Sequence, residues 1–176
     1  MQIAYPPRTA MDVFKMLPEG TLAEVINNQL FIAASPFSRH QRVSVVLENG
    51  FFNWLQKNNW GEMLHAPMDV YLDEIANAVQ PDIIILQNGG AVYIDDQGFV
   101  HGVPPIVVEI LLKGNKDHDK IIKKNLYEKF GVQEYFIVEP ETKEVIHYLL
   151  TGGMYIQLET TTAVLHSRLL NAHFEF

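Results

Sequence analysis

Two acidic residues stand at apolar runs that are otherwise typical of buried β-strands. Glu109 lies inside the run VVEIL, and Asp82 opens the run DIIIL. A carboxylate buried in a strand costs about 3 kcal/mol or more unless it is paired or bound to a cation. The sequence therefore predicts a compensating partner for Glu109, and the candidates are a metal ion, Lys123, or both.

The segment after Glu109 adds polar groups at helical spacing. Asp119, Lys123 and Tyr127 follow one another at intervals of four residues, which places them on one stripe of a helix. Two strands that each offer a carboxylate, with a lysine from the following helix, are the parts of a metal-dependent site that cleaves phosphodiesters. Asp82 and Glu109 would bind Mg²⁺ or Mn²⁺, because these hard ions prefer carboxylate and water oxygens.

The same residues carry a resemblance to a known family. Asp82, the run VVEIL, the pattern D-x-x-x-K-x-x-x-Y and the run GVQEYFIVEP resemble the PD-(D/E)xK nuclease superfamily. Within it they resemble the bacterial Uma-two family of restriction-endonuclease-like proteins, over about residues 22–153. The resemblance implies an endonuclease that uses Mg²⁺ or Mn²⁺ to hydrolyse DNA. A homodimer is expected as well, because nucleases that cut duplexes usually pair two sites across a two-fold axis.

The resemblance also implies roles for single residues. Asp82, Glu109 and Lys123 would be catalytic, and the backbone carbonyl of Ile110 would be the third metal ligand. Lys123 would position or deprotonate the attacking water, or stabilise the pentavalent state. The usual lysine position, two residues after the acid, holds Leu111 here, so the role moves to Lys123 in the following helix.

Another departure concerns the turn after the glutamate strand. The family usually has Leu-Ser-Pro-Ser there, whereas this chain has Leu-Leu-Lys-Gly at residues 111–114. This difference favours an alternative function, a catalytically inactive protein of the nuclease fold that serves as a nucleic-acid-binding or oligomeric module. A third interpretation is a purely structural ion pair between Glu109 and Lys123.

Four further residues are accessory candidates. Glu24 matches a family glutamate, and we interpret it as a surface strand residue, with an accessory metal ligand as the alternative. His40 matches the family's S-x-x-H stretch and would contact a substrate phosphate, or else cap or pack its helix. Tyr127 would hydrogen-bond Glu109, Lys123 or a phosphate, or else act as a core ring. Asp119 is the helix neighbour of Lys123.

The amino-acid composition excludes or disfavours several other classes of protein. The chain has 176 residues, no cysteine and a net charge of −8, which excludes disulfides and disfavours nonspecific coating of nucleic acid. No apolar run is long enough to span a membrane, and the first residues lack signal-peptide character, so we expect a cytoplasmic protein. One segment is locally basic, with a charge of +3, and its cations are Lys113, Lys116, Lys120, Lys123, Lys124 and Lys129.

The periodicities predict an α+β or α/β protein with a restriction-endonuclease-like core, in which helices flank a central mixed sheet with extra hairpins. Residues 1–20 are expected to form a lead-in with a short helix, 21–160 the nuclease-like domain, and 161–176 a tail that packs on the domain or a partner subunit. A parallel strand–helix–strand unit should connect the Glu109 strand to the strand at 134–138.

A long helix is predicted at 36–58, with Ser35 or Ser38 as its cap and a buried face of Val43, Val46, Leu47, Gly50 and Trp54, with Phe51 or Leu55 as a further member. Thr9 and Asp12 are expected to cap the short first helix, Asn27 and Asn28 to turn a hairpin, and Gly131 to end the helix that carries Lys123. Ile122, Leu126 and Phe130 form the stripe expected to pack that helix on the sheet.

Overall fold

The computed structural model describes residues 6–112, 114 and 116–176, so Lys113 and much of the expected N-terminal lead-in lie outside the described residues. The helices are α1 (Ala10–Phe14), α2 (Ser38–Asn58), the π-helix η1 (His118–Lys123) and α3 (Lys124–Phe130). The strands are β1 (Ala23–Ile26), β2 (Gln29–Ile32), β3 (Gly61–His65), β4 (Val70–Asp73), β5 (Asn77–Val79), β6 (Ile83–Gln87), β7 (Tyr93–Ile94), β8 (Val100–His101), β9 (Ile106–Ile110), β10 (Glu134–Val138), β11 (Glu144–Thr151), β12 (Met154–Gln157), β13 (Thr161–Thr162), β14 (Val164–Ser167) and β15 (Ala172–Glu175).

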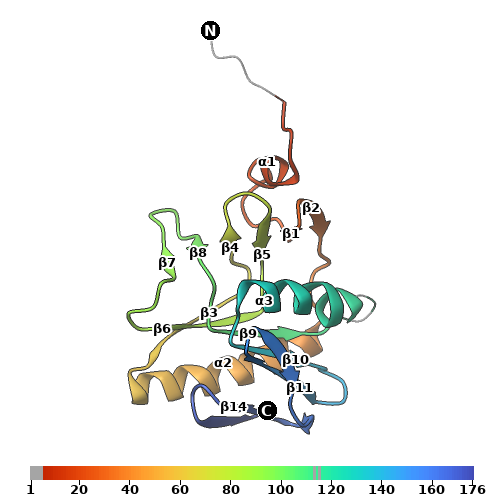
Figure 1. Cartoon of the computed structure of the whole chain (residues 1–176). Helices are drawn as coiled ribbons and strands as arrows, with labels where there is room; N and C mark the ends of the chain where they lie inside the picture. The colour runs from red at the N-terminus through yellow and green to blue at the C-terminus, as the bar shows by residue number, and fades with distance from the viewer. Residues whose placement is uncertain (1–5, 113, 115) are drawn as a thin grey trace.

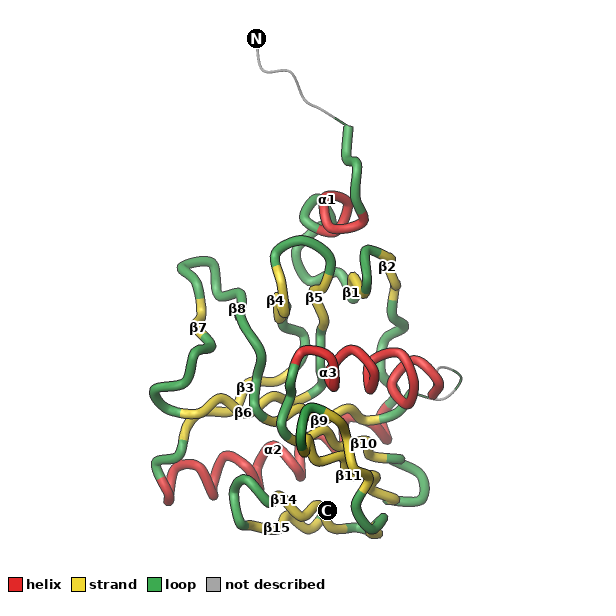
Figure 2. Tube along the Cα trace, viewed as in Figure 1, coloured by secondary structure: helices red, strands yellow, loops and turns green. Residues whose placement is uncertain are grey.

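The strands form two larger sheets and a separate C-terminal hairpin. The central sheet has the order β12-β11-β10-β9-β6-β3, with β13 also paired to β11. The upper sheet has the order β2-β1-β5-β4-β8-β7. In the central sheet β9 and β10 are parallel and enclose η1 and α3, which confirms the predicted parallel unit. Figure 1 shows α2 and α3 on opposite sides of this sheet, and Figure 2 shows the upper sheet rising beside α3.

Alternate residues of the central strands pack into two different hydrophobic cores, one on each face of the sheet. Ile83 and Ile85 of β6 pack toward α2, whereas Ile84 and Leu86 pack toward α3. This period of two places successive side chains on opposite faces of a sheet that is covered on both sides. It explains why the run Ile83–Leu86 has no polar residue.

Helix α2 was predicted in the right place, but its buried face was partly wrong. The buried apolar residues are Val43, Leu47, Phe51 and Leu55, at a strict spacing of four, whereas Val46 is exposed. Neither Ser35 nor Ser38 caps the helix, because the N-cap is Phe37 and it makes no side-chain hydrogen bond. Apolar residues occupy several adjacent positions of this helix, so the sequence pattern does not identify a single buried face.

Other local predictions are confirmed by backbone geometry. Thr9 and Asp12 form a reciprocal capping box at α1. Asn27 and Asn28 turn the β1–β2 hairpin with positive φ angles of 50° and 59°. Gly131 ends α3 in the left-handed region with φ 89°, where a side chain would be strained.

The C-terminal residues form a hairpin that packs on α2. Phe174 of β15 contacts the Phe51 ring with centroids 4.2 Å apart, and a Cβ at Gly50 would lie 3.3 Å from the Phe174 ring. Leu165, Leu170 and Phe174 thereby belong to the same core as α2. In the part of the chain that the structure describes, no helix is both long and apolar enough to cross a membrane.

Candidate active site

Asp82 and Glu109 meet at one end of the central sheet. Strands β6 and β9 are antiparallel with Ile83 opposite Val108, and continuing this register places Asp82 opposite Glu109. Directly opposed residues share a face, and here it is the face toward α3. Asp82 Oδ2 accepts a hydrogen bond of 2.7 Å from the Ile110 backbone N–H. The register therefore places the two acidic residues on one face at adjacent strand ends.

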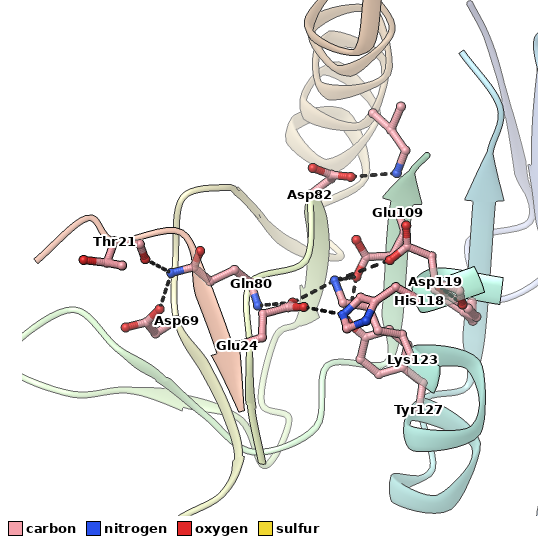
Figure 3. Close-up of polar contacts among 12 residues, drawn as sticks. Thr21, Glu24, Asp69, Gln80, Asp82, Glu109, His118, Asp119, Lys123 and Tyr127 are labelled. Carbon is pink, nitrogen blue, oxygen red and sulfur yellow. Dashed lines mark hydrogen bonds and ion pairs between the residues drawn. The ribbon is translucent and has the colours of Figure 1, made fainter. Parts of the chain in front are cut away.

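Lys123 lies beside Glu109, as predicted. Its Nζ donates to Glu109 Oε1 at 2.9 Å, and Tyr127 OH donates to the same oxygen at 2.8 Å (Figure 3). Glu109, Lys123 and Tyr127 are all buried. Among the described residues no donor contacts Glu109 Oε2, so both hydrogen bonds fall on one oxygen and the other is left without a partner.

Glu24 is where the structure corrects the sequence interpretation. It was placed on the surface of its strand, but it is only 5% exposed and Lys123 Nζ lies 2.7 Å from its Oε1. The Gln80 backbone N–H donates to the same oxygen at 2.8 Å. The upper sheet lies against the π-helix here, so strand β1 is covered on both faces and a polar residue inside it needs buried partners.

His118 is a further member of this cluster, and the sequence analysis missed it. Its Nε2 lies 2.9 Å from Glu24 Oε2, and the residue is 8% exposed. The seven histidines are scattered along the chain without helical pairing, so their spacing indicates no site. The one available signal was its place directly before Asp119.

The lysine-bearing helix begins as a π-helix rather than the regular α-helix expected. In η1 the Lys124 backbone N–H bonds to the Asp119 carbonyl, five residues back, before α3 continues regularly. Tyr135 OH donates to the same carbonyl at 2.9 Å. The wider turn leaves Asp119 Oδ1 3.7 Å from Lys123 Nζ, a looser contact than those of Glu24 and Glu109. Single π-turns occur often at functional sites.

The electrostatics of the cluster follow from many acids around one buried cation. Burial raises the pKa of Glu109 well above its ordinary value; Lys123 opposes this, while Asp119, Asp82 and Glu24 add to it. Burial also raises the pKa of Glu24, but Lys123 and the hydrogen bond from His118 outweigh it and bring the value to about 2. Burial would lower the pKa of Lys123, yet Glu109, Glu24 and Asp119 hold it well above its ordinary value. The surrounding carboxylates therefore favour the protonated form of Lys123.

His40 reaches the site from the first turn of α2. Its Nε2 lies 3.1 Å from Asp82 Oδ1, so Asp82 is contacted at both oxygens. His40 is 6% exposed, and its Nδ1 has no hydrogen-bond partner in the described part of the chain. The packed histidine of the sequence analysis thus also touches the carboxylate that opens β6.

These side chains line one cavity of about 420 Å³. Its polar members include Glu24, His40, Asp82, Glu109, His118, Asp119 and Lys123, whereas Tyr127 lies behind Glu109 and outside the lining. The β1–β2 hairpin and the start of α2 complete the walls with apolar residues. Within the described residues, no three His, Asp or Glu side chains are grouped so as to hold a metal ion by themselves.

Two other lysines of the basic segment, Lys116 and Lys124, have partners outside this cluster. Lys116 pairs with Glu139, and Lys124 pairs with Glu128 at 3.1 Å while its ammonium lies 5.5 Å from the centre of the Tyr148 ring. The predicted apolar stripe beside Lys123 is only partly correct, because Leu126 is buried but Ile122 is 37% exposed.

Comparison with known proteins identifies the family. The family model Uma2, described as "Putative restriction endonuclease", matches residues 11–175. The chain belongs to the Uma2 family. This confirms the family inferred from Asp82, Glu109 and the strand–helix–strand pattern. It places the protein among nucleases, enzymes that hydrolyse phosphodiester bonds.

A solved structure confirms the fold of this Uma2 protein. The crystal structure of a "putative nuclease belonging to DUF820" from Anabaena variabilis superposes with a TM-score of 0.76 at 13% sequence identity. The match covers 96% of this chain and 95% of the other. The mixed α+β, restriction-endonuclease-like fold predicted from the sequence is therefore confirmed. A search of curated proteins found no match.

Proposed function

We propose that this protein is a metal-dependent endonuclease that hydrolyses phosphodiester bonds of DNA. The observation that carries the proposal is the charge balance of the cavity. Glu24, Glu109 and Asp119 contact the single buried lysine of the cluster, and Asp82 lies opposite Glu109 on the neighbouring strand. Among the described residues, no donor contacts the second oxygen of Glu109. A buried excess of negative charge with a free carboxylate oxygen suits a divalent cation.

The donor set suits Mg²⁺ or Mn²⁺. Asp82 and Glu109 would hold the ion, with the Ile110 carbonyl as the third protein ligand and water in the remaining positions, as Mg²⁺ usually retains several waters. Ile110 donates its N–H toward Asp82, and the N–H and C=O of a strand residue point to the same side, so its carbonyl is expected there too. The bound ion would lower the pKa of a coordinated water and offset charge on the scissile phosphate.

Lys123 would act as a fixed positive charge. Its ammonium is held between Glu24 and Glu109, and its raised pKa keeps the proton in place at neutral pH. Of the roles left open by the sequence, proton removal from water is therefore disfavoured, and electrostatic stabilisation of the pentavalent phosphate or orientation of the water is favoured. Tyr127 would fix the Glu109 carboxylate through its 2.8 Å hydrogen bond.

The alternative function is a nucleic-acid-binding or oligomeric module that has lost catalysis. Leu111 at the usual lysine position and the net charge of −8 favour it. The geometry of Lys123 favours the enzyme, because the ammonium reaches Glu109 from the helix instead. Metal binding separates the two functions, since a scaffold gains nothing from converging acids that repel one another.

The experiment that tests the proposal combines DNA cleavage with thermal unfolding in Mn²⁺. Mn²⁺ should raise the midpoint of the wild type, because only a protein that binds the ion is stabilised by mass action. Asp82→Asn should abolish cleavage and remove this rise, and Asp96→Asn, on an exposed loop, should preserve both. Asparagine suits the test better than alanine because it can still accept the Ile110 N–H. An equal midpoint rise in wild type and Asp82→Asn, or cleavage by Asp82→Asn, contradicts the proposal.

A further inference from the structure

The proposed nuclease site needs a group that accepts a proton from the attacking water. Lys123 cannot accept one because its neighbouring carboxylates keep it protonated. Asp82 and Glu109 are assigned to the metal ion, and one Glu109 oxygen already receives two hydrogen bonds. The base must therefore be another residue of the same cavity.

We propose that His118, oriented by Glu24, is the general base of this site, an assignment that rests on the proposed function. His118 Nε2 lies 2.9 Å from Glu24 Oε2, both residues are buried, and both line the cavity that contains Asp82 and Glu109. Figure 3 shows the imidazole next to Glu24 and Lys123. A base held by a second group is the arrangement that activates nucleophiles in unrelated hydrolases.

The contact with Glu24 decides which ring nitrogen is free. The Glu24 carboxylate is held ionised by Lys123 and by the Gln80 N–H, so it can only accept. His118 must then donate from Nε2, which leaves the lone pair on Nδ1 of the neutral ring. A carboxylate partner also stabilises the imidazolium that forms when Nδ1 takes a proton.

The second ring nitrogen of His118, Nδ1, belongs to a side chain that lines the cavity. It makes no hydrogen bond to any described residue, and in that part of the chain the only fully buried side-chain nitrogens or oxygens without a partner are His40 Nδ1 and His147 Nε2. His40 is thereby a poorer base, because its free nitrogen is enclosed. The His118 ring also packs on Phe31, with centroids 4.9 Å apart, which limits its rotation.

The proposed step is balanced within the site. A water proton passes to His118 Nδ1 while the water oxygen forms a bond to phosphorus. The bond from phosphorus to the leaving oxygen then breaks, and that oxygen takes a proton from solvent. His118 returns its proton to solvent after the product leaves, and Glu24 stays ionised throughout.

Several charged groups will shape the pH dependence of this step. Glu24 faces His118 from β1, and Asp119 and Lys123 face it from its own helix. Across the cavity lie Glu48, His40, Asp82 and Glu109. Asp119 is the rival base, because it lines the same cavity and makes only a long contact, 3.7 Å, with Lys123.

The test is a set of pH–rate profiles at saturating Mn²⁺ for the wild type, His118→Gln and Asp119→Asn. The glutamine amide can donate to Glu24 from the position of Nε2 but offers no base at Nδ1. We expect His118→Gln to lose about 100-fold or more in cleavage rate and to lose the acidic limb of the pH–rate profile, because the glutamine amide cannot accept the proton. Asp119→Asn should keep that limb. The Mn²⁺ midpoint rise should be unchanged in both variants.

Further variants and substrates distinguish a catalytic role of His118 from a structural one. His173→Gln changes an exposed histidine of the C-terminal hairpin and should leave the rate and profile unchanged. Added imidazole should restore part of the activity of His118→Gly, which a merely structural role would not allow. The loss in His118→Gln should persist on a 4-nitrophenyl phosphodiester, whose leaving group needs no protonation.

The outcomes separate the two proposals. If the wild type binds Mn²⁺ and cleaves, but His118→Gln retains activity within about threefold and keeps the acidic limb, the assignment of His118 is wrong and the nuclease proposal stands. If Asp119→Asn alone removes the limb, Asp119 is the base. A wild type that neither binds Mn²⁺ nor cleaves overturns both.

Discussion

Two buried glutamates of the central sheet have opposite surroundings. Glu109 is the penultimate residue of β9 and lies on the α3 face. Glu134 begins β10 on the α2 face and pairs in register with Ile106, at the other end of these strands. Both are 3% exposed or less. A sequence would rank them as equally unusual.

Their hydrogen bonds explain why only one of them marks a site. Glu134 Oε2 accepts a hydrogen bond of 2.5 Å from the Ser167 hydroxyl, and Glu134 Oε1 accepts one of 2.6 Å from the Arg168 backbone N–H. His147 Nε2 lies 3.1 Å from Glu134 Oε1. Both of its oxygens accept hydrogen bonds, and Glu134 is not among the residues that line the cavity of about 420 Å³. Glu109 has donors on one oxygen, carboxylate neighbours and an open cavity. Both glutamates are thus buried. Glu109 is distinguished by a carboxylate oxygen without a described donor and by the cavity next to it.

The largest predicted effect comes from removing the cation of the Glu109 cluster. Lys123→Met leaves Glu24 and Glu109 buried and unpaired, so it should lower the free energy of unfolding by about 3–5 kcal/mol in metal-free buffer. It should also lower the cleavage rate by about 100-fold or more. Lys124→Met is the control, because it breaks only a partly exposed pair with Glu128, and its stability cost should be below about 1 kcal/mol. Equal losses in the two variants would show that Lys123 is only part of a basic surface.

The second prediction compares the two glutamates directly by denaturant unfolding at neutral pH without metal. Glu134→Gln replaces one of the two acceptor oxygens by an amide NH₂, which then faces either the Ser167 hydroxyl or the Arg168 N–H, and it should cost about 3 kcal/mol. Glu109→Gln should leave stability equal or higher, because burial, together with the neighbouring like charges, raises the pKa of Glu109 and disfavours its ionised form. A large loss in Glu109→Gln would mean that Glu109 is a structural ion-pair partner.

The third prediction concerns pH. Glu109 has a raised folded-state pKa, so its contribution to stability is full below the ordinary value of 4.5 and is lost as pH rises above it. Glu24 has a lowered folded-state pKa of about 2, so its contribution to stability is full above 4.5. That contribution is lost as the pH falls toward 2. The stability of wild type relative to Glu109→Gln should therefore fall with rising pH above 4.5, by at most about 1.4 kcal/mol per pH unit. The stability of the wild type relative to Glu24→Gln should fall as the pH decreases below 4.5. Unfolding curves measured across pH 2–8 without metal check both directions, and slopes of the same sign would contradict them.

The smallest effects should come from deleting one hydroxyl at each glutamate. Ser167→Ala removes a donor to Glu134 and an acceptor for the Leu170 N–H, and should cost about 2 kcal/mol. Tyr127→Phe removes one donor from Glu109 and should cost about 1 kcal/mol, because Lys123 still holds the same oxygen. Thermal unfolding measures both. A greater stability loss in Tyr127→Phe than in Ser167→Ala would mean that the Glu109 cluster is the more tightly satisfied of the two.

The sequence by itself determined the elements that local patterns specify. The apolar run after Asp82, the glutamate inside VVEIL and the turn residues Asn27, Asn28 and Gly131 predicted strands, hairpin and helix end that the structure contains. The strand–helix–strand order also predicted that Lys123 returns to the Glu109 strand end. Alternation, turn chemistry and short connections act within a few residues, so they can be followed along the chain.

Only the tertiary structure decided which distant groups complete the cluster. Glu24 and His118 are separated by 94 positions, and neither has a spacing that points to the other. The sequence placed Glu24 on a surface because no local signal shows that β1, within the upper sheet, packs against the π-helix. The sequence likewise could not tell Glu109 from Glu134, because the partners of Glu134 come from the C-terminal hairpin. Whether a buried charge is satisfied depends on which surfaces meet in three dimensions, and the pattern of one strand does not contain that information.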